Sequence, residues 1–201
     1  IRQVKKIALF TEYTNENFFT RSICATTIAL NEKEIYFLNF YHNPLMLSTI
    51  LQAIWQMKEL EIFTAHAKRD IRHAIINNWP IAADFWDVIQ LHYIIASQGE
   101  GSFERIVKQV LGDTVDIEVV SQEKLQLLEV PDKQIYLTNR AYALFKVGEI
   151  YQQQLSELDM QNVYQDIDKK LIPVLAKMEK EGILLNPGHL AMLEKEFQRL
   201  L

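Results

Sequence analysis

The chain has 201 residues, 49% of them hydrophobic and 23% charged, a composition that excludes extended intrinsic disorder. With 21 Lys and Arg against 26 Asp and Glu, the formal charge of -5 argues against a strongly basic nucleic-acid clamp. The lone Cys24 excludes an internal disulfide and fits a reducing, cytoplasmic compartment, and no apolar run reaches the roughly 18 residues of a membrane span. This length predicts one large domain, or one domain plus part of another.

The first part of the chain is predicted to form most of a sheet. The apolar run Ile7–Phe10 indicates a buried, central strand, and Ile23–Leu30 and Glu34–Phe40 indicate two more. Three strands in succession favour an antiparallel meander. A helix is expected to begin near Pro44, and a short strand is expected at Glu61–Thr64.

Helical spacing of apolar residues dominates the rest of the chain. The stripe that begins at Leu47 and includes Leu60 predicts one helical face, and Asp84–Ala96 also has the spacing of a helix. Further helices are expected over Ala67–Asn77 and, capped by Ser102, over Phe103–Leu111, whereas 112–135 gives no clear prediction. The order of elements predicts an α/β domain, a mixed β-sheet flanked by helices.

Two long helices are expected near the end, over Tyr136–Leu155 and Met160–Glu181, with Gly182 closing the second and Pro187 opening another. That last helix runs to the end of the chain without a stop signal. We therefore expect a piece of a longer protein, with a second domain beginning near Met160.

Two acids stand at positions that can carry chemistry. Glu12 follows the first apolar run, where a lone carboxylate is more often an ordinary strand-end residue than a metal ligand. Asp70 falls in the first turn of a helix, where the helix dipole alone favours an acid. The five histidines, His42, His66, His73, His92 and His189, show no zinc-binding spacing. Cys24, inside an apolar run, is expected to be an inert core thiol.

The stretch from Asn162 to Ile183 closely resembles the segment that joins the 3′–5′ exonuclease domain to the polymerase domain in bacterial DNA polymerase I, a family A polymerase. Its sequence, NVYQDIDKKLIPVLAKMEKEGI, places Pro173 inside a continuous apolar helical stripe, where a kink is expected. Glycine-rich phosphate-binding and serine-hydrolase motifs do not occur in the chain.

Once this segment is aligned with the family, three earlier stretches resemble the family's exonuclease motifs. Ile7–Glu12 resembles the first motif, Ala67–Asp70 the second and Tyr136–Arg140 the third, and Ala83–Ile95 is similar to the strand-to-helix passage after the second. The resemblance implies a ribonuclease-H-like (DnaQ-type exonuclease) mixed sheet flanked by helices, followed by long helices of a truncated second domain. It implies an exonuclease-like domain over 1–158 and the beginning of a polymerase domain over 159–201.

The family's chemistry is two-metal hydrolysis of a phosphodiester, with four carboxylates as ligands and a tyrosine that orients water. By resemblance, this chain keeps Glu12, Asp70 and Tyr136 of that set. Phe10 and Arg140 stand where the two other acids are expected. His66 stands at a neighbouring position where the family has an amide.

The replacement by Arg140 has the larger electrostatic effect. An Asp-to-Arg change alters the local charge by two units, each worth on the order of 4 kcal/mol at a few ångströms and an effective dielectric near 20. We therefore predict a vestigial site at which Glu12 and Asp70 bind metal weakly or not at all, and no cofactor in this chain. Arg140 is expected either to take the metal's place, paired with Asp70 or Glu12, or to point into solvent.

Three functions remain open. The leading one is a monomeric, non-membrane fragment of a DNA polymerase, with a vestigial exonuclease domain in a structural role and DNA bound through the parent polymerase. The second is an active proofreading exonuclease that binds Mg²⁺ or Mn²⁺ with Glu12, Asp70 and a displaced acid such as Asp84 or Asp87. The third is a stand-alone protein-interaction domain.

Overall fold

The computed structural model describes residues 4–14, 22–40, 44–96, 101–117, 120 and 122–200. Among these, the strands of the sheet are β1 (Lys6–Tyr13), β2 (Ile23–Ala29), β3 (Ile35–Asn39), β4 (Glu61–Thr64) and β5 (Asp84–Asp87). Their spatial order is β3-β2-β1-β4-β5. The first three pair antiparallel, and β4 and β5 run parallel to β1. The predicted mixed sheet, its antiparallel meander and the central place of β1 are therefore confirmed.

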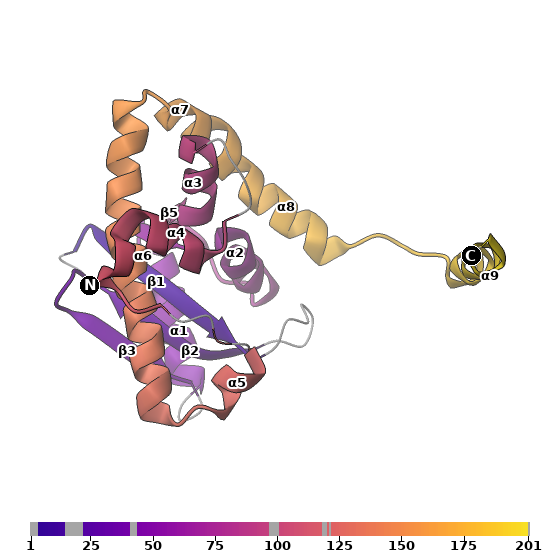
Figure 1. The fold of residues 1–201 in the computed structure, drawn as a ribbon, viewed down its shortest axis with the longest axis horizontal. Helices are drawn as coiled ribbons and strands as arrows, with labels where there is room; N and C mark the ends of the chain where they lie inside the picture. The colour runs from indigo at the N-terminus through magenta and orange to yellow at the C-terminus, as the bar shows by residue number, and fades with distance from the viewer. Residues whose placement is uncertain are drawn as a thin grey trace.

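Helices cover both faces of this sheet, and the last helix stands apart from the body (Figure 1). The helices are α1 (Pro44–Trp55), α2 (Ala67–Ile76), α3 (Val88–Ala96), α4 (Phe103–Leu111), α5 (Gln122–Leu127), α6 (Val130–Glu157), α7 (Gln161–Val163), α8 (Lys169–Glu181) and α9 (Pro187–Leu200). No described helix is both long and apolar enough to cross a membrane.

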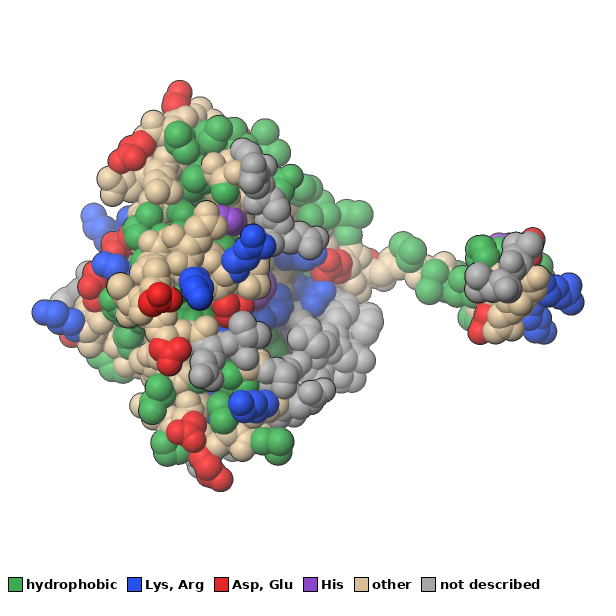
Figure 2. Space-filling model, viewed as in Figure 1, with side chains coloured by type: hydrophobic (Ala, Val, Ile, Leu, Met, Phe, Trp, Pro, Cys, Tyr) green, Lys and Arg blue, Asp and Glu red, His purple; other side chains and the backbone are tan. Residues whose placement is uncertain are grey.

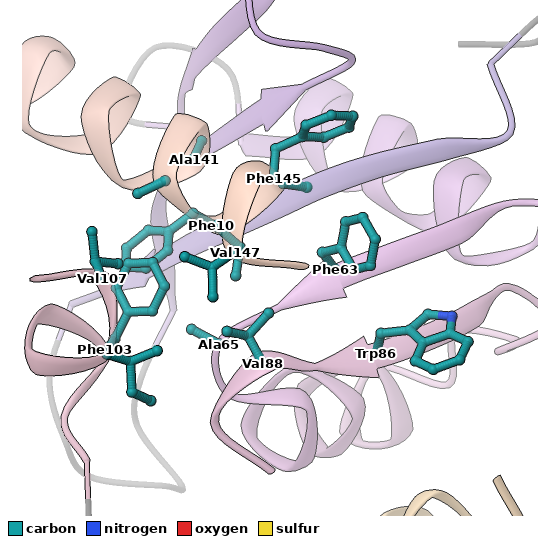
Figure 3. Close-up of a cluster of buried hydrophobic side chains, with 14 of the residues drawn as sticks. Phe10, Phe63, Ala65, Trp86, Val88, Phe103, Val107, Ala141, Phe145 and Val147 are labelled. Atoms are coloured by element: carbon teal, nitrogen blue, oxygen red, sulfur yellow. The ribbon is translucent and has the colours of Figure 1, made fainter. Parts of the chain in front are cut away.

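The side chains of β1 alternate between two hydrophobic cores. Ala8 and Phe10 point to the face covered by α3, α4 and α6, where Phe10 faces Phe103 and Val107 (Figure 3). Ile7 and Leu9 point to the opposite face, covered by α1, α2 and α8. This alternation follows from the period of two in a strand, and burial on both faces accounts for the continuous apolar run.

One predicted helix, Asp84–Ala96, is wrong in its first turn. Residues Asp84–Asp87 form β5, and α3 begins only at Val88. Phe85 packs into the core of α1 and α2 whereas Trp86 packs into the opposite core, as neighbours in a strand do. A short apolar run supports either period, and pairing with β4 decides the strand. The strand-to-helix passage implied by the resemblance is confirmed.

Two helix boundaries also differ from the predictions. The helix α1 ends at Trp55, so Leu60 lies outside it, directly before β4, and reaches the same core from there. The helix α6 begins at Val130 rather than at Tyr136, with Pro131 in its first turn. Proline is favoured at that position because its missing N–H would have no helical partner.

The predicted helix Met160–Glu181 is interrupted before its proline. Pro173 lies inside α8, and the departure from α-helical geometry is a π-helical turn at Tyr164–Asp168. The turn directs Tyr164 into the body, where its ring stacks on Trp86 with centroids 5.1 Å apart. π-Helical turns of this kind typically reposition one side chain within a helix.

Residues on both sides of position 158 contribute to the two cores. Tyr164 is fully buried in one core, and Ile172 and Ala176 of α8 are buried in the other. On the surface, Lys68 and Arg72 of α2 form ion pairs with Glu179 of α8. The boundary between residues 158 and 159 stays a prediction, because the sequence places it by resemblance and this packing joins the helices around it.

Candidate functional site

The three exonuclease-like motifs meet near the end of β1. Glu12 lies there, half-buried, beside a bulge between Glu12 and Tyr13. Asp70 comes from the first turn of α2, and Tyr136 and Arg140 come from successive turns of α6. The structure therefore brings the residues from the three separate motifs into one region, where their side chains contact different partners.

Asp70 is buried and hydrogen-bonded on both carboxylate oxygens. The hydroxyl of Tyr13 donates to Oδ1 at 3.0 Å and that of Thr64 to Oδ2 at 2.7 Å. Arg69 pairs with the same Oδ1 at 3.4 Å and also donates to the carbonyl of Thr11. These contacts satisfy the charge that burial would otherwise make costly, and they tie the start of α2 to β1 and β4.

Arg140 is buried, with 2% of its surface exposed. Its Nη2 donates to Oε1 of Glu104 at 2.8 Å, and its guanidinium lies 3.7 Å from the centroid of the Tyr136 ring. The predicted internal position of Arg140 is confirmed and the solvent-exposed alternative is wrong. Arg140 pairs with Glu104, an acid outside the two predicted partners Asp70 and Glu12, and Asp70 pairs with Arg69.

Glu104 was not identified as a site residue in the sequence. It lies in the first turn of α4, where an acid is favoured by the helix dipole, and it belongs to none of the three motifs. It also lines a cleft of about 590 Å³ between α4 and residues 112–117. Only packing of α4 against α6 brings it to Arg140, so no local signal pointed to it.

Glu12 lies within electrostatic range of the neighbouring motifs. Burial raises the pKa of Tyr136, Arg140 opposes this, and the charges of Glu104 and Glu12 add to the rise. Burial depresses the pKa of Arg69, but Asp70, Tyr13 and Glu12 outweigh that effect and raise it. Glu12 therefore acts on a residue of the second motif and on a residue of the third.

Phe10 stands where the resemblance places the first acid. Its side chain is 8% exposed and packs against Phe103 of α4, with ring centroids 5.7 Å apart. An aromatic ring offers no ligand to a hard cation. Within the described part of the chain, no group of three or more His, Cys, Asp or Glu side chains has an arrangement that could hold a metal ion.

The two acids considered as displaced ligands have other partners. Asp84, the first residue of β5, forms an ion pair with Lys169. Asp87 accepts from the backbone N–H groups of Ala67, Ile89 and Gln90, so it links the starts of α2 and α3. Both acids therefore have structural roles at β5.

Burial raises the pKa of Asp87 to about 6, although the three N–H donors oppose that rise. Because the folded pKa lies above the ordinary value, folding favours the protonated form. The stability from this carboxyl is complete below about pH 4 and is lost as the pH rises through 6. We expect the wild type to lose on the order of 3 kcal/mol of unfolding free energy relative to Asp87→Asn between pH 4 and 7. Urea unfolding of both proteins at each pH measures this difference, and a pH-independent difference would contradict it.

The described histidines and the cysteine have separate surroundings. His66 is exposed, directly before α2, His73 stacks edge-on against Tyr13, and His92 hydrogen-bonds the hydroxyl of Tyr151. His189 is exposed on α9, and His42 lies outside the described residues. Cys24 is buried in β2, and burial, with the charge of Glu12, raises its pKa to about 11. This fits the expected inert thiol.

Known proteins resemble the chain in fold rather than in sequence. No family model matches it, and no curated protein sequence matches it. Among solved structures, Brucella melitensis NrnC is similar with a TM-score of 0.71 at 11% identity, covering 90% of this chain and 87% of that one. Escherichia coli RNase D, an exoribonuclease involved in structured RNA processing, has a TM-score of 0.70 at 13% identity, covering 91% of this chain and 47% of its own.

A polymerase is also among the similar structures. The POL domain of Pol1 from M. smegmatis, in complex with a DNA primer-template and dNTP, has a TM-score of 0.73 at 15% identity. That match covers 98% of this chain, which spans 32% of the polymerase chain. At such identities the likeness shows the fold alone. The chain therefore has the ribonuclease-H-like mixed sheet of the DnaQ-type exonucleases.

Proposed function

We propose that this chain is a piece of a family A DNA polymerase, in which a vestigial exonuclease-like domain supports the polymerase domain without degrading DNA. The observation that carries the proposal is the environment of Arg140. A buried guanidinium paired with Glu104 stands at the position that resembles the last metal-binding acid. A divalent cation beside it would face repulsion of several kcal/mol at the distances involved.

The rest of the donor set supports the same proposal. Phe10 is part of the core with Phe103, so the first strand offers Glu12 alone to a metal. Both oxygens of Asp70 already accept hydrogen bonds from Tyr13 and Thr64. These residues do not fit the four-carboxylate site of two-metal hydrolysis, and the proposal includes no hydrolytic step.

Two features favour a polymerase parent over a stand-alone nuclease. The match to the Pol1 structure extends over 98% of this chain, against 90% for NrnC and 91% for RNase D. In addition, the segment Asn162–Ile183 resembles the exonuclease-to-polymerase junction of the family. The second feature lies in the C-terminal helices, where the polymerase domain is expected to begin at residue 159.

Exposed apolar side chains on the C-terminal helices support a structural role. Figure 2 shows hydrophobic side chains over α7 and α8 and along the segment that leads to α9. The large apolar residues exposed there include Val163, Ile167, Leu171, Val174, Met178, Ile183, Leu184 and Leu185. An exposed patch of this kind usually marks a contact with another protein surface. We propose that the remainder of the polymerase chain covers it, and that the parent binds DNA mainly outside this domain, as a monomer.

An exonuclease assay tests the proposal. The purified chain is incubated with a 5′-labelled single strand and a primed duplex in Mg²⁺ or Mn²⁺, and shortening is followed on a gel. We expect no metal-dependent shortening above that of the variants Glu12→Ala and Asp70→Ala, and no DNA synthesis when dNTPs are added. An active DnaQ-type exonuclease serves as the positive control.

The assay also decides between the alternatives. Shortening that both alanine variants abolish would establish the active proofreading exonuclease and overturn the vestigial site. The ion pair of Asp84 with Lys169 and the three amide contacts of Asp87 count against either acid as a displaced ligand. A natural chain that ends near residue 201 would instead support the stand-alone interaction domain.

A further inference from the structure

Among the described residues, charged side chains of opposite sign gather near the end of β1. The acids are Glu12, Asp70 and Glu104, and the bases are Arg69, Lys133 and Arg140. Arg69 pairs with Asp70, Arg140 pairs with Glu104, and Glu12 and Lys133 exert opposite effects on the same buried thiol of Cys24. The negative charges of these three carboxylates are therefore offset by basic side chains of the protein.

Arg140 is the most enclosed of these cations. It has 2% of its surface exposed, whereas the side chain of Arg69 has 27%. One contact is the Glu104 carboxylate at 2.8 Å, and another is the Tyr136 ring, whose centroid lies 3.7 Å from the guanidinium carbon. Tyr136 precedes Arg140 by one helical turn, so α6 itself supplies the stacking surface. This arrangement holds the guanidinium in a defined place.

Glu104 comes from a different helix. It is 24% exposed and joins α4 to α6 across the region between the motifs. None of the motif resemblances requires an acid at this position, and its charge reaches Tyr136 together with that of Glu12. The charges of two carboxylates, one from β1 and one from α4, therefore act on Tyr136 in the third-motif turn of α6, and Glu104 also contacts that turn through Arg140.

We propose that the guanidinium of Arg140 takes the place of a metal ion near the end of β1 and that Glu104 is the acid that positions it. The Arg140–Glu104 pair then keeps a divalent metal ion from binding between Glu104 and Glu12. This inference rests on the proposed vestigial function and identifies the residues that maintain it. The ligand that the acids would take without Arg140 is a hard divalent cation such as Mn²⁺.

The test is Mn²⁺ binding by the variant Arg140→Asp, measured by electron paramagnetic resonance of free Mn²⁺ and by calorimetry. The matched control is Arg105→Asp, which makes the same charge change on the exposed face of α4. We expect Arg140→Asp to bind one Mn²⁺ at least about tenfold more tightly than either the wild type or the control, because it adds a carboxylate and removes a cation. Adding Glu104→Gln is expected to abolish the gain.

Equal Mn²⁺ binding by the two Asp variants would overturn this inference while leaving the proposed function intact. Tight Mn²⁺ binding with DNA cleavage by the wild type would overturn both. Circular dichroism shows whether Arg140→Asp is folded. If Arg140→Asp is not folded, the stabilities of Arg140→Gln, Glu104→Gln and the double variant, measured as unfolding midpoints, test whether Arg140 and Glu104 act as a pair. We expect the double variant to lose clearly less than the sum of the single losses, and additive losses would refute the pair.

Discussion

Replacement of Gly148 by alanine is expected to lower the free energy of unfolding by about 2 kcal/mol, although alanine is the better helix former by about 1 kcal/mol. Gly148 lies in α6, where that helix crosses the ring of Phe63 on β4. A Cβ at this position would lie 2.5 to 2.8 Å from three carbons of the ring. Such distances force the helix away from the sheet, and α6 carries Tyr136 and Arg140. Urea unfolding followed by circular dichroism measures the effect.

The control is the same substitution at Gly188, an exposed helical position where the nearest atom to a new Cβ, Oδ1 of Asn186, lies 3.4 Å away. It should not lower the free energy of unfolding, and the better helix propensity of alanine should raise it by at most about 1 kcal/mol. A second test adds Phe63→Leu to Gly148→Ala, which should cost less than the sum of the two single changes. A Gly148→Ala protein that is as stable as the wild type would show that α6 does not approach β4 this closely.

Replacement of Tyr164 by alanine is expected to lower the free energy of unfolding by about 4 kcal/mol, because it removes a fully buried ring. The ring stacks on Trp86 at an angle of 17°. Its hydroxyl donates to the carbonyl of Phe85 at 3.2 Å and accepts from the N–H of Asp87 at 2.8 Å. Tyr164→Phe keeps the ring but leaves that N–H without its acceptor, and we expect a loss of about 2 kcal/mol.

The matched control is Tyr93→Ala on α3, where the tyrosine is 68% exposed, and it should alter stability by less than about 0.5 kcal/mol. The experiment also tests the predicted boundary between residues 158 and 159. A large loss at Tyr164 would show that the folding unit of the sheet extends past residue 158. A loss no larger than that at Tyr93 would show that the sheet domain folds without this helix.

The sheet could be predicted well because its strands carry strong local signals. The runs Ile7–Phe10 and Ile23–Leu30 are apolar and are followed by polar or turn-forming residues, which favours buried strands whatever surrounds them. The strand Asp84–Asp87 could not be predicted by periodicity, since its apolar residues fit a helix equally well. Pairing with β4, a contact between segments distant in sequence, decides its conformation.

The candidate site shows the same division. The family resemblance identified Phe10 and Arg140 as departures from an acidic motif, and an internal ion pair was one of the two positions left open for Arg140. Its partner could not be identified, because Glu104 lies 36 positions away and has the local features of an ordinary first-turn acid. Asp87 was a candidate ligand in the sequence, whereas its contacts with backbone amides appear only after α2 and α3 are placed.

The sequence by itself determined most of the strands and helices, because these depend on residue type and local spacing, and the family resemblance identified the loss of two acids from the motifs. Only the tertiary structure decided which acid Arg140 contacts, where β5 replaces a helical turn and how Tyr164 joins the C-terminal helices to the sheet. These features depend on contacts across the fold, whose energies come from burial and from charges brought together by packing.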